Sequence, residues 1–160
     1  MEACSSCYGM CCETFNVPVT DSDLRRLMEC GVDVSDCVGF ISICEMSSSY
    51  PDVRLDDGYY HMVLERLGGA CVLAIRAGGG LRCGVHGHHH LACQLYPINA
   101  VTGKPKKGHI CHFKGFDGVD HAGLGERNVR EVRGYGRKVR AWNQTRGEHT
   151  VEGFLKHLLE

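Results

Sequence analysis

Four cysteines stand within nine residues near the start of the sequence. They are Cys4, Cys7, Cys11 and Cys12, and their spacing is C-x2-C-x3-C-C. Two thiolates separated by two residues can form a tight turn that presents both sulfurs to one metal ion. The side chains of the adjacent Cys11 and Cys12 diverge, so this pair is more easily shared between two metals, or between a metal and another structural role. Because buried free cysteines are usually scattered, the string predicts a thiolate metal site.

Disulfide bonds are the alternative use for the eleven cysteines of the chain. They form in oxidising compartments, and an exported protein usually begins with a basic stretch followed by an apolar run. The sequence opens instead with Met1-Glu2-Ala3-Cys4, and it contains no apolar segment of the roughly 18 residues that span a bilayer. We therefore expect a cytosolic protein without a membrane partner, in which clustered thiols bind metal. A secreted protein that had lost its leader would share these features, so disulfides stay an alternative.

Four further cysteines lie on and beyond a predicted hairpin, at Cys71, Cys83, Cys93 and Cys111. In series, the opening string, the C-V-x-L…G-x-x-C hairpin and the A-C-x-x-Y-P segment resemble the cysteine-cluster family named after its C-x2-C-x3-C-C motif. The resemblance covers roughly residues 4–111. Members of that family are described as zinc- or iron-chelating proteins, and most have no assigned reaction. The resemblance implies that the ligands come from Cys4, Cys7, Cys11, Cys12, Cys71, Cys83, Cys93 and Cys111.

Histidines fill the segment between Cys83 of the hairpin and Cys93 of the A-C-x-x-Y-P segment. Many members of the family carry an aromatic residue and an Arg-Pro pair there, whereas this sequence has His86, His88, His89 and His90. Imidazole binds zinc, iron, copper and nickel. We therefore add His86 and His89 to the candidate ligands, and expect at least one of these imidazoles to bind the metal or a ligand thiolate. The alternative is a solvated polar loop.

The identity of the metal follows from the number and type of its ligands. Eight thiolates could form two four-sulfur zinc sites, or one iron–sulfur cluster with thiols left over. Zinc is the first choice because C-x2-C turns and added histidines suit it, and iron or an iron–sulfur cluster is the alternative. The predicted function is a cytosolic metal-binding protein, with a protein or peptide as a further possible partner. A metal-dependent enzyme acting on a peptide or protein, and a metallochaperone or metal store, are the alternative functions.

The elements that must position these residues follow from local signals. Thr20 and the acids after it predict a helix over residues 20–30. Strand-forming residues predict strands at 59–64 and 71–75, and three glycines predict a turn at 78–80 before a return strand at 81–85. Further helices are predicted at 34–44, 127–143 and 151–159, whereas residues 98–126 are expected to be irregular. These elements predict one α+β domain over 1–160, with a short antiparallel hairpin-centred sheet flanked by helices.

Three other cysteines recur at intervals of seven residues, at Cys30, Cys37 and Cys44. This spacing would place them on one side of helical segments. We expect a stripe of small core residues, with a third thiol site as the alternative.

Charge is unevenly distributed along a chain whose formal net charge is −1. Residues 1–60 contain eleven acidic and three basic side chains, whereas residues 104–160 contain seven acidic and twelve basic ones. The two parts could attract each other, or the basic end could bind an anionic partner. On the predicted helix 127–143, four arginines share one face, and an apolar face with Tyr135 and Trp142 lies apart from it. A docked helix with a solvated arginine face explains this pattern, so we do not expect a nucleic-acid partner.

Overall fold

The computed structural model of this protein describes residues 9–46, 48–88, 90–99, 104–108, 110–111 and 120–160. The helices are α1 (Met10–Thr14), α2 (Asp21–Glu29), α3 (Leu91–Leu95), α4 (His121–Asn143) and α5 (Val151–Leu159), with a 3-10 turn at Val34–Asp36. The strands are β1 (Val38–Ser42), β2 (Val53–Leu55), β3 (Gly58–Leu64), β4 (Arg66–Leu67), β5 (Ala70–Cys71), β6 (Ala74–Ala77) and β7 (Gly80–Cys83). This mixture confirms the α+β class. None of the described helices is both long and apolar enough to cross a membrane.

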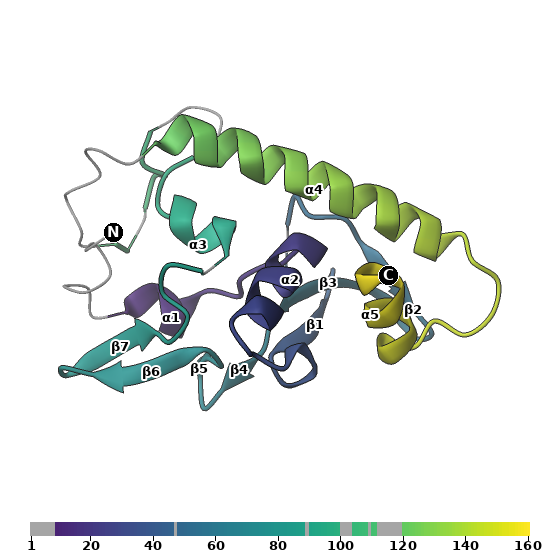
Figure 1. Ribbon diagram of the computed structural model, residues 1–160, viewed down its shortest axis with the longest axis horizontal. Helices are drawn as coiled ribbons and strands as arrows, with labels where there is room; N and C mark the ends of the chain where they lie inside the picture. The colour runs from purple at the N-terminus through teal and green to yellow at the C-terminus, as the bar shows by residue number, and fades with distance from the viewer. Residues whose placement is uncertain (1–8, 47, 89, 100–103, 109, 112–119) are drawn as a thin grey trace.

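The largest sheet has the strand order β1-β3-β2, and β3 pairs antiparallel with both neighbours. Val38 lies opposite Leu64 on one side of β3, and Val53 lies opposite Tyr60 on the other. The remaining strands form two separate hairpins, β4–β5 and β6–β7. Figure 1 shows these hairpins at the end of the molecule that also contains α1, away from α5. The elements that carry candidate ligand cysteines (α1, β5, β7 and α3), called the cysteine-bearing part below, therefore lie beside the main sheet and not within it.

The hydrophobic core lies between the main sheet and the helices α2, α4 and α5. Its fully buried side chains include Leu24, Leu27, Val53, Met62, Tyr135, Val139, Phe154 and Leu158. The buried face of α4 is the one that its sequence pattern predicted, and Arg130, Arg133, Arg137 and Arg140 are exposed on the other face. In Figure 1, α4 lies along the outside of the molecule, over α3 near its start and over β2 and α5 near its end. One helix thus joins the cysteine-bearing part to the core.

Three predicted helices are confirmed, and their ends have local causes. Thr20 caps α2 in a capping box, because its hydroxyl accepts from the Asp23 N–H while the Asp23 carboxylate accepts from the Thr20 N–H. Helix α4 begins earlier than predicted, at His121, where the Asp120 carboxylate accepts a 2.8 Å hydrogen bond from the Gly123 N–H. The expectation of irregular chain up to residue 126 was therefore wrong at its end, because the Asp120 cap and the tertiary contacts of α4 with α3 together offset the cost of two glycines.

The predicted helix over residues 34–44 is wrong. Only the 3-10 turn Val34–Asp36 is helical, and the following residues form β1, which pairs with β3. Valine, phenylalanine and isoleucine in this segment suit a strand, and the available partner decides the outcome. The expected cysteine stripe is lost with the helix. Cys37 is 2% exposed in the core, whereas Cys30 and Cys44 are exposed.

The predicted hairpin around the three glycines is confirmed, but both strands are shorter than predicted, and the return strand ends at Cys83 instead of residue 85. β6 and β7 pair from Ala74 opposite Cys83 to Ala77 opposite Gly80. The expected strand over residues 71–75 is divided, because β5 ends at Cys71 and β6 begins at Ala74. This break lets Cys71 pair with Arg66 in the β4–β5 hairpin while the next strand turns toward β7.

Candidate metal centre

The described end of the N-terminal cysteine string, Cys11 and Cys12, lies against the β6–β7 hairpin. Cys11 and Cys12 belong to α1, which follows Gly9. The φ angle of Gly9 is 75°, and a Cβ atom at this position would lie 2.4 Å from the carbonyl oxygen of Leu81. Only glycine fits such a close approach of two backbones in this conformation. The described part of the string therefore packs directly on β7.

Arg66 fixes the other end of α1. Its guanidinium donates to the Phe15 carbonyl at 2.9 Å, and also to the carbonyls of Glu13 and Gly69. Carbonyl groups at a helix end are unpaired and partly negative, so a cation is stabilising there. The clamp ties α1 to the β4–β5 turn, and sequence reasoning assigned nothing to this arginine.

The thiols of four separate elements influence one another. Burial raises the pKa of Cys93 well above its ordinary value, and the negative charges of Cys83, Cys11 and Cys71 raise it further. Burial likewise raises the pKa of Cys71, while the Arg66 cation opposes this and Cys11 adds to it. Such interactions weaken with distance. They therefore place the thiols of α1, β5, β7 and α3 in one neighbourhood.

The two thiols of α1 also interact with each other. A hydrogen bond with Cys12 and burial both raise the pKa of Cys11. In the metal-free chain Cys11 therefore holds its proton, because a thiolate next to a second thiol and away from water is destabilised. A bound cation would reverse that preference, as metal ligation requires deprotonated sulfur.

Tyr96 brings Cys111 to the same region. The Tyr96 hydroxyl accepts a 2.9 Å hydrogen bond from the Ile110 N–H, and its ring lies 5.1 Å from that of Phe15. Burial raises the pKa of Tyr96, and the charges of Cys111 and Cys11 raise it further. The tyrosine therefore lies near both sulfurs. Its motif segment was recognised in the sequence, but its contacts with Ile110 and Phe15 were not.

The described donors fit zinc or iron in their chemistry but do not by themselves close a coordination sphere. Thiolates select soft or borderline metals such as zinc and iron. Among the described residues, no three histidine, cysteine or acidic side chains converge closely enough to hold one ion, and the described cysteines form no disulfide. Cys4 and Cys7, which complete the motif, lie outside the described residues.

The histidine segment divides between surface and interior. His86 and His88 are exposed, and His90 is 2% exposed. Burial lowers the pKa of His90, and the charged groups that act on it are Asp23 and Arg26. His90 thus faces a buried ion pair. His89 lies outside the described residues, and ligation by His86 or His89 stays a prediction.

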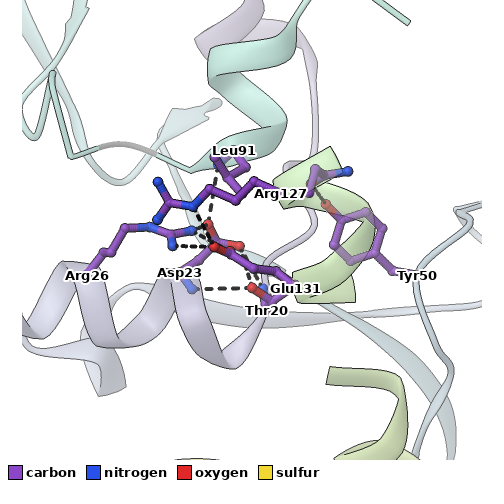
Figure 2. Close-up of polar contacts among 8 residues, drawn as sticks. Thr20, Asp23, Arg26, Tyr50, Leu91, Arg127 and Glu131 are labelled. Atoms are coloured by element: carbon purple, nitrogen blue, oxygen red, sulfur yellow. Dashed lines mark hydrogen bonds and ion pairs between the residues drawn. The ribbon is translucent and has the colours of Figure 1, made fainter. Parts of the chain in front are cut away.

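A buried polar network connects α3 with α2 and α4 (Figure 2). Asp23, which is 3% exposed, accepts hydrogen bonds from Thr20 and from the N–H of Leu91 at the start of α3. Arg26 binds Asp23 and also donates two 2.9 Å hydrogen bonds to Glu131 of α4. Sequence reasoning assigned the acids after Thr20 only to the start of the helix. The network holds the helix that contains Cys93.

The outer part of the network lies on α4 and a nearby loop. Arg127 donates a 2.8 Å hydrogen bond to Glu131, and the Tyr50 hydroxyl donates one of 3.3 Å to Asn128 (Figure 2). Burial raises the pKa of Tyr50, and the charges of Asp23 and Cys93 raise it further. Tyr50 therefore lies near both the buried carboxylate of Asp23 and the thiol of Cys93.

Comparison with protein families gives one match. Residues 3–112 match the CxxCxxCC family, whose description is "Putative zinc- or iron-chelating domain". The chain belongs to this family. The CxxCxxCC match includes every candidate ligand, whereas α4 and α5 lie beyond it. The family name has two residues before its paired cysteines, and this chain has three, between Cys7 and Cys11. Comparison with curated proteins and with solved structures found no match.

Proposed function

We propose that this chain is a cytosolic metal-binding protein that holds zinc through the thiolates of its N-terminal string and of the hairpin region. The ligands would come from Cys4, Cys7, Cys11, Cys12, Cys71, Cys83, Cys93 and Cys111. The observation that carries the proposal is the packing of α1 on β5 and β7, and the thiols of these three elements are close enough to raise the pKa of Cys93 in α3. The family description supports a metal, and the thiol donor set suits both zinc and iron.

The bound metal would act on the protein's structure. It would link α1, the two hairpins and α3, which otherwise contact one another through few buried apolar side chains. Zinc coordinated by four protein ligands serves structure, whereas an open position would allow chemistry. Arg66 and Tyr96 would hold the cysteine-bearing segments in place around the ion, because each contacts backbone or rings from two of these segments.

Metal content is the test of this function. The full chain, purified without air or added metal, is expected to contain tightly bound zinc by plasma mass spectrometry and to be colourless. The Cys93→Ser variant is expected to bind the metal at least about tenfold more weakly. Removing a group that only hydrogen-bonds a metal ligand already lowers metal affinity by about tenfold or more, and removing the ligand itself should cost at least as much. Cys30→Ser and Cys44→Ser are matched controls on exposed cysteines and should retain full metal content. A chain that contains no metal, or equal losses in all three variants, would refute the proposal.

Colour separates the proposed metal from its alternative. An iron–sulfur cluster is held by cysteine thiolates as well, and it would make the protein brown with visible absorption. If the purified protein contains iron and an equal amount of sulfide, the metal is an iron–sulfur cluster and not zinc. The proposed cysteine ligands would stay the same. Loss of that colour in Cys93→Ser, and not in Cys44→Ser, would then identify the same site.

The proposed site is expected to release its metal as the pH falls. Metal binds the thiolate, so each ligand thiol must lose its proton on binding. Burial raises the pKa of Cys71 and Cys93, so both thiols are protonated at neutral pH without metal. Affinity should therefore increase with pH, by about tenfold per pH unit for each proton released. Competition with a zinc-binding dye between about pH 6 and pH 8 measures this slope, and an affinity that does not change with pH would exclude thiol ligation.

A further inference from the structure

The exposed face of α4 contains a groove that the metal site does not use. It has a volume of about 400 Å³ and lies between α4 and the first turn of α2. Its lining residues are Asp21, Ser22, Arg130, Glu131, Gly134, Arg137 and Lys138. None of them is a candidate ligand. A variant of the groove can therefore be tested for partner binding without changing a proposed metal ligand.

Two of the positively charged side chains that line the groove have no ion-pair partner among the described residues. Asp21 is paired with Lys138 at 3.0 Å, and Glu131 is paired with Arg26 at 2.9 Å. Arg130 and Arg137 are exposed and form no ion pair with any residue that the structure describes. They lie seven residues apart on one helix face, which is about 10 Å along the axis. Each guanidinium can bind one carboxylate through two hydrogen bonds. The pair can therefore bind two carboxylates of one extended acidic ligand.

Gly134 forms the floor of the groove between these two arginines. Glycine in a helix interior is destabilising relative to alanine, so its presence calls for a reason. Gly136 has one, since a Cβ there would lie 3.2 Å from the Pro51 ring. At Gly134 a Cβ would meet only the end of the Arg137 side chain, at 3.9 Å. No neighbour within the described protein requires this glycine, and its effect is to keep the groove open.

We propose that this groove binds an acidic segment of a partner protein, with Arg130 and Arg137 each binding a carboxylate over Gly134. The chemistry favours a protein over a nucleic acid. Both carboxylates of the lining are paired with cations, so the groove offers two separate arginines, which suit two discrete carboxylates better than a continuous run of phosphates. The chain as a whole has a formal net charge of −1, whereas nucleic-acid-binding domains are usually strongly basic.

Binding of a labelled deca-glutamate peptide tests the proposal, with deca-lysine and a decathymidylate oligonucleotide as comparison probes. The metal-loaded full chain is measured by fluorescence anisotropy in about 50 mM salt, where exposed charges are weakly screened. The wild-type chain should bind the glutamate peptide, and the Arg130→Glu/Arg137→Glu variant should bind it at least about tenfold more weakly. The matched control, Arg54→Glu/Arg146→Glu, changes the net charge equally at exposed arginines outside the groove and should bind within about twofold of wild type.

Filling the groove provides a test that leaves its charges unchanged. Gly134→Leu should weaken peptide binding at least about fivefold, because the side chain occupies the space between the two arginines. Ala141→Leu adds leucine at an exposed position of the same helix outside the groove, and should bind like wild type. Circular dichroism and metal content verify the fold, and Arg130→Gln/Arg137→Gln replaces the charge reversal if that variant does not fold.

Three results would overturn the proposal. The first is tighter binding of decathymidylate than of deca-glutamate, which would make the groove a nucleic-acid site. The second is equal weakening in the two charge-reversal variants, which would indicate attraction by net charge alone. The third is unchanged binding in Gly134→Leu. Metal content is measured on the same samples, so failure of the groove and failure of the metal site are distinguished.

Discussion

Replacing Asp23 with alanine is expected to lower the free energy of unfolding by about 3–5 kcal/mol. The carboxylate is buried and accepts hydrogen bonds from the backbone N–H groups of Thr20 and Leu91 as well as from Arg26. Its removal leaves those donors unpaired and takes one partner from the Arg26 guanidinium, whose side chain is only 15% exposed. Denaturant unfolding followed by the fluorescence of Trp142, the only tryptophan, measures the loss.

Arg127→Ala is the matched control for this prediction. Arg127 binds the same network through Glu131, but its side chain is 44% exposed. An exposed pair one helical turn apart contributes only about 0.3–0.5 kcal/mol. If Asp23→Ala and Arg127→Ala destabilised the protein equally, the buried network would not be the anchor that its geometry indicates. A selective effect on Asp23 should also reduce metal affinity, because the Leu91 N–H begins the helix that contains Cys93.

Removal of the metal is expected to loosen the cysteine-bearing part of the protein while the core stays folded. Structural zinc supplies on the order of 10–16 kcal/mol of apparent binding energy, about as much as the stability of a whole domain. Helices α2, α4 and α5 and the main sheet have a core of their own that is independent of the candidate ligands except at its edge, where Cys71 packs. The loss should therefore be confined to α1, the two hairpins and α3.

Hydrogen exchange and tryptophan fluorescence together measure this expectation. After chelation, amide protection should fall in residues 70–98, whereas Trp142 emission should not change. Trp142 is 7% exposed and packs on Phe154, with ring centres 5.5 Å apart, in the metal-independent core. Chelator already saturated with zinc is the control, and returning zinc should restore protection. An immediate red shift of Trp142 emission on chelation would show that the core also depends on the metal, and would contradict this expectation.

Local chemistry explains the elements that sequence reasoning predicted. The start of α2 follows from the reciprocal hydrogen bonds of Thr20 and Asp23, which lie three residues apart. The buried face of α4 follows from apolar residues that recur at the helical period, such as Tyr135, Val139 and Trp142. Glycines with positive φ angles at 78 and 79 form the predicted turn. Each signal acts between near neighbours, so it is present in the sequence itself.

Long-range pairing decided the elements that sequence reasoning missed. Residues 38–42 pair with β3, more than fifteen residues further along the chain, and this pairing replaces the predicted helix. The same change buries Cys37 and exposes Cys44, which seven-residue spacing had grouped together. A strand gains its hydrogen bonds from a partner. Its sequence alone does not contain that partner.

The candidate site divides in the same way. The sequence by itself determined the donor chemistry, since clustered cysteines at motif spacing and the family match both point to a thiolate metal centre. The tertiary structure decided how the donors are held: Arg66 clamps α1, and Asp23 anchors α3 through a network that reaches Glu131 beyond the family match. A cysteine keeps its chemistry in any fold. A charged side chain becomes a structural anchor only when folding removes it from water and places its partners around it.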